Sequence, residues 1–249
     1  MPPKKKKSIS VQNIITQKAL KFIRKNKKKI IEQFAGHCEE PSSSGAILTF
    51  FMAGSPGAGK TELSKGLIRH IGRRLGRKIV RIDADEIRNF LPSDLYTGKN
   101  SDVVQGAAVR GVEILYDHII KTGKHTILDG TFVDLEKAQN NIERALKFER
   151  KRTVEIWYVY QDPLLAWEFT KQREIIEGRR VPKRSFIQSF FKAKQNVEKI
   201  KADFGNQVAL HVIKKDYKNA IEDSWLDVQS VDECFQISYS ETTLVDKLK

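Results

Sequence analysis

From residue 46 to residue 214, short apolar runs alternate with longer segments in which apolar positions recur every three or four residues. Short runs predict buried β-strands, and the longer spacing predicts amphipathic helices. Strands are expected at 46–53, 78–83, 125–129, 153–160 and 208–214. Helices are expected at 60–75, 103–122, 135–150, 163–177 and 183–203. This order predicts an α/β fold with a doubly wound, mostly parallel sheet and helices on both faces.

The N-terminal segment has a different pattern. Apolar residues form one stripe along Ser10–Phe34, and lysines occupy the rest of the surface, which predicts an amphipathic helix. Ser10 is the expected N-cap and Gly36 the expected end, with a linker over 38–45. The sequence therefore predicts a basic helical arm and linker at 1–45 followed by a second domain at 46–249.

The last segment, 216–249, has the weakest pattern. An edge strand is expected over Glu233–Tyr239 and a short helix over Thr242–Leu248.

Charge is distributed unevenly. Residues 1–36 hold eleven of the 45 Lys and Arg residues against one acidic residue, so this segment carries +10 of the formal charge of +14. The other residues carry only the remaining +4, a net charge that is ordinary for a soluble domain. Contact with nucleic acid is therefore expected only through the arm.

The start of the chain lacks the apolar core of a secretory signal, and no run is long enough to cross a bilayer. The two cysteines, Cys38 and Cys234, lack metal-ligand spacing and suit a reducing compartment. A cytoplasmic location is the resulting expectation.

A phosphate-binding loop follows the first predicted strand. Its pattern is G-x-x-x-x-G-K-[ST], formed by Gly54, Ser55, Pro56, Gly57, Ala58, Gly59, Lys60 and Thr61. Glycines let the backbone N–H groups approach phosphate oxygens, and the next helix adds the positive end of its dipole. Lys60 is expected to reach the β- and γ-phosphates, and the Thr61 hydroxyl is expected to bind Mg²⁺. The sequence therefore predicts binding of ATP or GTP with Mg²⁺.

Carboxylates follow the next two strands. Asp83 and Asp85 end the strand at 78–83, and a kinase needs one such carboxylate to deprotonate the attacking hydroxyl. One of the pair is expected to cap the following helix and the other to act in catalysis. Asp129 ends the next strand, where P-loop proteins hold Mg²⁺ directly or through water.

A basic segment between two helices predicts a lid over about 173–185. Gly178 and Pro182 break the helical pattern, and Arg173 and Arg179 lie on either side of this break. In P-loop kinases such arginines stabilise the charge that develops on the γ-phosphate.

Glu113 lies within a predicted helix, where a glutamate is most often solvated.

Four segments in this order resemble the zeta toxin family of P-loop kinases. They are Gly-Ser-Pro-Gly-Ala-Gly-Lys-Thr, Ile-Asp-Ala-Asp-Glu-Ile-Arg, Ile-Leu-Asp-Gly-Thr and Arg-Arg-Val-Pro-Lys, within about residues 46–214. The resemblance implies a P-loop NTPase-type fold. It also implies phosphorylation of UDP-N-acetylglucosamine at the 3′-hydroxyl of its amino sugar by ATP or GTP with Mg²⁺.

The resemblance also implies residue roles. Asp85 matches the catalytic base, and Lys60 and Thr61 match the nucleotide and metal residues. Arg173 and Arg179 match the arginines that hold the γ-phosphate. The residues matched to the sugar-nucleotide site are Glu113, Asp129 and Thr131, with Asp83 beside them and Asp129 also a candidate metal ligand.

Three positions differ from the best-known members of the family. Asp129 stands where they have Glu, Val133 where they have Arg, and Ala84 where they have a polar residue. All three lie on the acceptor side of the expected site.

Two other functions remain open from the sequence. A kinase for the 5′-hydroxyl of nucleic acid would share the loop, the base and the lid, and the basic arm could hold its backbone. A nucleotide-dependent regulatory switch would hydrolyse ATP or GTP without an acceptor. The arm itself could brace the body, mask the nucleotide site as an antitoxin-type inhibitor does in this family, or bind an anionic partner. The brace is favoured because the apolar stripe is too extensive for a free tail.

Overall fold

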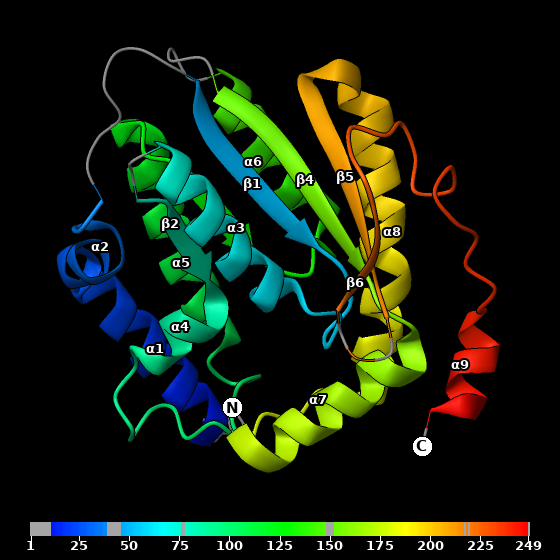
Figure 1. Ribbon diagram of the computed structural model, residues 1–249. Helices are drawn as coiled ribbons and strands as arrows, with labels where there is room; N and C mark the ends of the chain where they lie inside the picture. Colours follow the sequence, from blue (N-terminus) through cyan, green and yellow to red (C-terminus); the bar gives the residue numbers. More distant parts are fainter. Residues whose placement is uncertain are drawn as a thin grey trace, which may run out of the picture.

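The computed structural model describes residues 11–38, 46–75, 78–147, 152–216, 218 and 220–248. A six-stranded sheet in the order β2-β3-β1-β4-β5-β6 forms its centre (Figure 1). The strands are β1 Ile47–Ala53, β2 Val80–Asp83, β3 Thr126–Asp129, β4 Arg152–Tyr160, β5 Val208–Lys215 and β6 Ile221–Trp225. Strands β1 to β5 pair in parallel, and β6 pairs antiparallel with β5. The predicted α/β fold with a mostly parallel sheet is confirmed.

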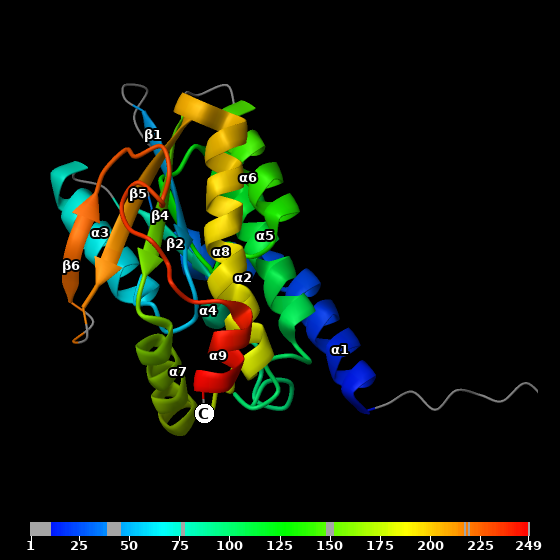
Figure 2. The ribbon, with the colours of Figure 1, turned by 90° about the vertical axis from the view of Figure 1, so that its right-hand side faces the viewer.

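Helices cover both faces of this sheet. Helix α3 (Lys60–Leu75) lies on one face, and α5 (Gln105–Thr122), α6 (Leu135–Lys147) and α8 (Lys183–Phe204) lie on the other (Figure 2). Alternate residues of β1 serve the two faces: Phe50 and Met52 join the α3 cluster, and Phe51 and Ala53 join the larger core opposite. Because both faces are covered, β1 is a continuous apolar run.

Two helices lie at the carboxyl edge of the sheet. Helix α4 (Ala84–Asn89) begins directly after β2, and α7 (Pro163–Glu177) runs below the ends of the strands (Figure 1). The bounds of α7 coincide with the prediction. Helix α6 ends at Lys147, and residues 148–150 of the predicted helix lie outside the described part of the chain.

The N-terminal arm forms two helices, α1 (Val11–Lys25) and α2 (Lys27–Ala35), so the single helix predicted there is wrong. They meet at Asn26, whose side-chain amide donates to the Phe22 carbonyl oxygen at 2.9 Å, one turn back. The expected N-cap at Ser10 and the linker residues 39–45 lie outside the described residues.

The arm packs against the body. Helices α1 and α2 both contact α5, and Ile23 and Ile30 are fully buried in the same core as the sheet. The rings of Phe22 and Phe90 lie 5.8 Å apart between centroids. This packing agrees with the expected brace. The division of the chain near residue 45 into two domains stays a prediction.

The C-terminal segment differs from the prediction in one element. The edge strand expected over Glu233–Tyr239 is wrong, because β6 occupies that edge of the sheet. Phe235 instead packs its ring against Tyr160 at 4.6 Å and Trp225 at 5.9 Å. The predicted short helix is confirmed as α9 (Glu241–Lys247). Among the described helices, no segment combines the length and apolarity needed to span a bilayer.

Candidate active site

The phosphate-binding loop is folded tightly against β4 and α7. Gly54 and Gly57 have positive φ angles of 138° and 76°. A Cβ at these positions would lie 2.3 Å from the Val159 carbonyl oxygen and 2.1 Å from the Ala166 carbonyl oxygen, respectively. Both positions therefore require glycine, for conformation and for space.

Lys60 begins α3 and points back into the loop. Its side chain is buried, and Nζ donates to the Ser55 carbonyl oxygen at 2.6 Å. Burial lowers the pKa of Lys60 from 10.5 to about 8, with Arg179 and Arg173 acting in the same direction. The site thus holds a desolvated cation that the phosphates of a nucleotide would stabilise.

A cavity of about 930 Å³ lies where the phosphate loop, the carboxyl ends of the strands, α7 and the loop after α7 meet. It collects most of the residues that the sequence singled out. These are Pro56, Gly57, Gly59, Lys60, Thr61, Asp83, Asp85, Glu113, Asp129, Thr131, Arg173 and Arg179.

The other three loop residues, Gly54, Ser55 and Ala58, do not line the cavity but contact the residues around it. The Gly54 N–H donates to the Thr131 carbonyl oxygen at 3.4 Å, the Ser55 carbonyl accepts from Lys60, and Ala58 is buried in the α3 cluster.

The carboxylates at the strand ends are joined by an arginine that the sequence analysis had not assigned. Asp83 and Asp129 are aligned in the β2–β3 register, and β3 separates β2 from β1. The strand that ends in Asp83 is therefore not the neighbour of β1. Arg81 donates to Asp129 at 2.6 Å and to Glu86 at 2.5 Å, and it also pairs with Asp83. Its single positive charge is thus shared among three carboxylates.

The two aspartates after β2 have different surroundings. Asp83 is the N-cap of α4, and its Oδ1 accepts from the Asp85 N–H at 2.8 Å. Burial and the nearby Asp85 raise the pKa of Asp83 to about 6, against the opposing effect of Arg81. One aspartate of the pair, Asp83, caps the helix, as expected, and Asp85 lies in the first turn of that helix.

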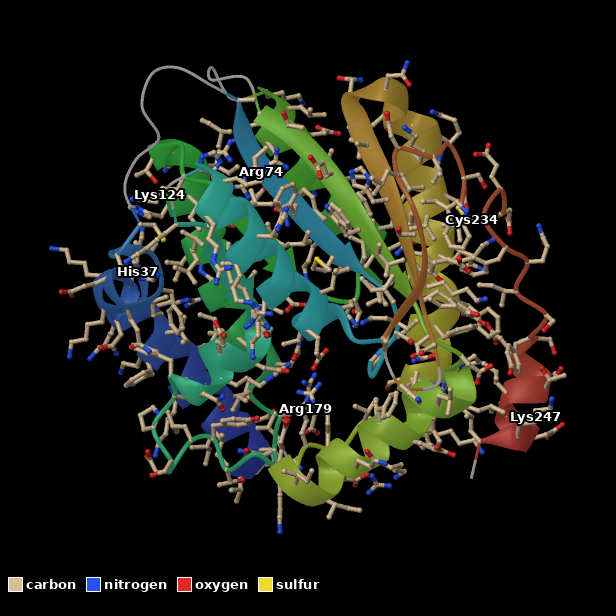
Figure 3. All side chains as sticks on the ribbon, viewed as in Figure 1. His37, Arg74, Lys124, Arg179, Cys234 and Lys247 are labelled. Atoms are coloured by element: carbon tan, nitrogen blue, oxygen red, sulfur yellow. The ribbon has the colours of Figure 1, made fainter. Side chains whose placement is uncertain are left out.

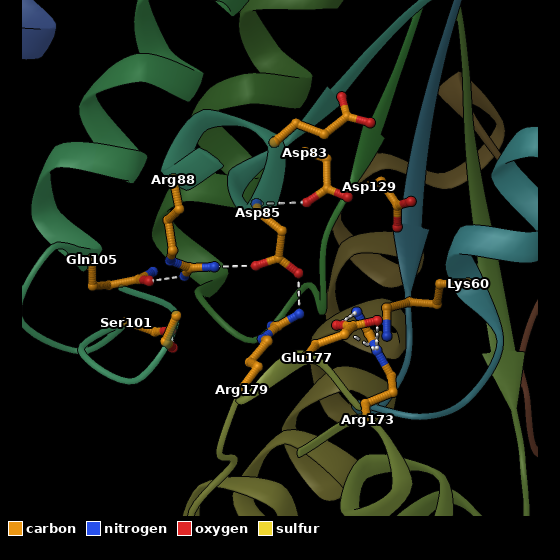
Figure 4. A network of polar contacts seen from close by, with 12 residues as sticks. Lys60, Asp83, Asp85, Arg88, Ser101, Gln105, Asp129, Arg173, Glu177 and Arg179 are labelled. Carbon is orange, nitrogen blue, oxygen red and sulfur yellow. Dashed lines mark hydrogen bonds and ion pairs between the residues drawn. The ribbon is translucent and has the colours of Figure 1, made fainter. Parts of the chain in front are cut away.

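Asp85 lies between two arginines (Figure 4). Its Oδ1 accepts from Arg88 on α4, and its Oδ2 accepts from Arg179 in the loop after α7. Sequence reasoning did not single out Arg88, although its position three residues after Asp85 in a helix is a usable signal. In Figure 3, Arg179 projects from this loop toward the gap below the sheet.

Arg173 lies on α7, and the carboxylate of Glu177 accepts from its Nη2 at 3.1 Å. Figure 4 shows Arg173 close to Lys60. In the structure as described, each of the two arginines expected to hold a γ-phosphate is thus paired with a carboxylate of the chain.

Glu113 reaches the cavity from α5. Its side chain is half-exposed, and it accepts from Arg110 at 3.0 Å. Neither cysteine lines the cavity, and none of the cavity residues belongs to α1 or α2. The described part of the arm therefore does not mask the site.

The residues expected to hold Mg²⁺ are Thr61 and Asp129. Asp129 lines the cavity, and its Oδ2 accepts hydrogen bonds from Ser64, at 2.8 Å, and from Arg81. The described residues contain no group of three or more His, Cys, Asp or Glu side chains that would hold a metal alone. A hydroxyl and one carboxylate oxygen fit a Mg²⁺ ion that is also bound by nucleotide phosphates.

The phosphate loop after β1, the carboxylates after β2 and β3 and the arginines of α7 and the loop after it together define the class of P-loop kinases. The sequence model of the family described as zeta toxin matches residues 12–226, which include α2 and all of α1 but its first residue. The chain therefore belongs to the zeta toxin family.

Solved structures share this fold. One is from the PezAT chromosomal toxin–antitoxin system of Streptococcus pneumoniae, 15% identical, with a TM-score of 0.57 over 96% of this chain and 90% of that one. Another is the AvrRxo1-ORF1:AvrRxo1-ORF2 complex with sulphate ions, 13% identical, with a TM-score of 0.60 over 90% of this chain and 71% of that one. At these identities the likeness concerns the fold.

A curated relative matches over a short stretch. It is the Lon protease of Desulfosudis oleivorans, 42% identical over 67 residues. The match covers 27% of this chain and 8% of that protein.

Proposed function

We propose that this chain is a kinase that uses ATP or GTP to phosphorylate a sugar nucleotide, at the 3′-hydroxyl of the amino sugar of UDP-N-acetylglucosamine or a related compound. The observation that supports the proposal most is the shared cavity. It joins the phosphate loop, Asp85 and the lid arginines, which are the parts that phosphoryl transfer from a nucleotide to a hydroxyl requires.

In the proposed mechanism Asp85 accepts the proton of the acceptor hydroxyl. Lys60, Arg173 and Arg179 neutralise the charge on the phosphates as the γ-phosphoryl group moves to the acceptor oxygen. Thr61 and Asp129 would hold Mg²⁺, which would supply further neutralisation of the phosphate charge. The chain's own contribution is positioning and electrostatic stabilisation.

The acceptor is proposed from family membership together with the lining of the cavity. Glu113, Asp129 and Thr131 line it beside Asp85, and they occupy the positions that the resemblance matches to sugar-nucleotide contacts. The cavity volume of about 930 Å³ is within the range of pockets that enclose a small-molecule ligand. The shorter Asp129 and the apolar Val133 make a related sugar nucleotide the main alternative acceptor.

The test is a transfer assay with γ-labelled ATP or GTP and Mg²⁺. The acceptors are UDP-N-acetylglucosamine, other UDP-sugars, a 5′-hydroxyl oligonucleotide and water alone. Label should appear on a UDP-sugar, and NMR should place it on the 3′-oxygen. The Asp85→Asn variant should bind nucleotide and transfer no label. Transfer only to the oligonucleotide would replace the proposal with a nucleic-acid kinase, and release of phosphate regardless of acceptor would favour a switch.

An inhibitor protein is proposed as a partner because the PezAT neighbour comes from a toxin–antitoxin system. The active chain should then arrest growth when it is expressed in a bacterial host, and Asp85→Asn should not. Equal growth with both would argue against a toxin.

A further inference from the structure

The carboxylate of Asp85 is bound from two sides by arginines that differ in burial. Arg88 lies on the same helix, α4, with only 8% of its side chain exposed. One of its terminal nitrogens donates to Oδ1 of Asp85 and the other to Oε1 of Gln105 on α5. A guanidinium buried between two packed helices and bonded at both ends cannot move independently of them.

Arg179 approaches the opposite oxygen from a loop. It donates to Oδ2 of Asp85, and its side chain is 28% exposed. The loop follows Gly178, the left-handed residue that ends α7, and it precedes Pro182 at the start of α8. The described residues of this loop form neither helix nor strand. The contact of Arg179 with Asp85 can therefore be exchanged without disrupting a packed element.

We propose that Arg88 is the positioning residue for Asp85, that it anchors Oδ1, and that Oδ2 is the oxygen that accepts the acceptor proton once Arg179 has moved from it to the γ-phosphate of the nucleotide. This inference rests on the proposed function, because it assigns roles within the same site.

The chemical step balances with these groups alone. The acceptor O–H bond breaks and its proton moves to Oδ2 of Asp85. The acceptor oxygen forms a bond to the γ-phosphorus, and the bond between that phosphorus and the bridging oxygen breaks. ADP or GDP leaves with the bonding electrons. Arg88 stays on Oδ1 throughout and keeps the carboxylate oriented.

The exchange by Arg179 follows from charge. In the described structure one carboxylate faces two guanidinium groups, and Lys60 lines the same cavity as Arg179. A triphosphate bound at Lys60 would bring several negative charges to the same place. Arg179 would then gain a stronger partner, and Oδ2 of Asp85 would lose its contact with Arg179 only when the nucleotide is bound.

The test of Arg88 compares Arg88→Met with Arg88→Lys. The Met variant should lower kcat about 100-fold or more, because a misplaced base loses that much, while the Kd for ATP changes less than threefold. The Lys variant should recover part of kcat. Gln105→Leu, which removes only the outer contact, should lower kcat by a smaller factor.

A structural role alone would not move the pH profile. The charged groups that face Arg88 are Asp85, Arg179 and Asp83, with the Tyr96 phenol nearby. Loss of its charge favours the protonated form of a neighbouring carboxylate, so the acidic limb of kcat should shift to higher pH in Arg88→Met. Unchanged kcat in a folded Arg88→Met variant, or an unshifted acidic limb with lower kcat, would overturn the positioning role.

The exchange has a readout that needs no acceptor. Asp85→Asn removes the charge that holds Arg179, so it should tighten binding of ATP several-fold in the wild-type background and have no such effect in Arg179→Met. The neighbouring Arg180→Met is the matched control, because Arg180 is exposed and lies outside the cavity. Equal tightening in the presence and absence of Arg179 would refute the exchange.

If the wild-type chain transfers phosphate to no sugar nucleotide, the proposed acceptor is wrong. The Arg88 comparison is then made on ATP hydrolysis with water as acceptor, where the same loss of kcat is expected.

Discussion

Lys60 makes the affinity for nucleotide depend on pH. In the free chain the pKa of its ammonium group is lowered from 10.5 to about 8, mainly by burial. Bound phosphates would favour the charged form and return the pKa toward its ordinary value. The free lysine is therefore largely neutral at pH 9, whereas the lysine in the complex is charged.

The expected magnitude follows from this difference. At pH 9, one unit above the free pKa, binding must first protonate the lysine, which weakens the Kd about tenfold relative to pH 7. About 0.9 proton should be taken up per nucleotide at pH 9 and about 0.1 at pH 7. Calorimetric titration with a non-hydrolysable ATP analogue and Mg²⁺, in buffers of different ionisation enthalpy, measures both quantities.

The stability of the free chain depends on pH in the opposite direction to its affinity for nucleotide. Because the pKa of a base is depressed in the folded state, the charged lysine destabilises the free fold below pH 8, and this penalty fades as the pH rises from about 8 to 10.5. Lys60→Met should therefore stabilise the free chain at pH 7 by up to about 3 kcal/mol and abolish nucleotide binding. Lys60→Arg, which stays charged, should bind without this pH dependence. A constant Kd with no proton uptake between pH 7 and 9 in the wild type would refute the reasoning.

Three further predictions concern stability, the loop and the lid. Ile23→Ala should destabilise the whole fold by about 2–5 kcal/mol in urea denaturation, because the side chain is fully buried in the main core. Gly57→Ala should weaken ATP binding at least tenfold in calorimetry, since its Cβ would lie 2.1 Å from a carbonyl oxygen of α7. Arg173→Ala should lower kcat about 10³-fold in the transfer assay, whereas Arg180→Ala should leave kcat near that of the wild type.

Each of these predictions has a contrary outcome. A local loss of helix in Ile23→Ala, with an unchanged midpoint for the body, would mean that the arm folds separately. Normal ATP affinity in Gly57→Ala would mean that the loop can shift away from α7. Equal loss of kcat in the Arg173 and Arg180 variants would indicate a general charge effect of the lid.

The parallel strands could be predicted from the sequence because each is an apolar run covered on both faces. Their order could not, since β2 and β3 carry similar patterns and only tertiary pairing places β3 beside β1. β6 was missed because Ile221–Trp225 is mostly polar and exposed, as an edge strand can be. The break at Asn26 was missed because the apolar stripe continues through it.

The predicted site residues come together because the carboxyl ends of parallel strands share one edge of the sheet. Motif spacing could indicate Lys60 and Asp85, but it could not identify their partners. Arg81 lies within β2, and its pairing with Asp129 depends on strand order. Gln105 reaches Arg88 from a helix that begins sixteen residues after α4. Such contacts depend on tertiary packing, which the pattern of a single sequence does not predict.

The way α1 and α2 lie on α5 decides where the chain can be cut. A truncated protein that began at β1 would uncover the apolar face against which Ala19, Ile23 and Ile30 are packed without exposure to water. That fragment should aggregate during refolding, and limited proteolysis of the intact protein should spare both helices. These results would make the smallest autonomous folding unit larger than the nucleotide-binding core, so a fusion that carries this kinase would need α1 and α2 as well.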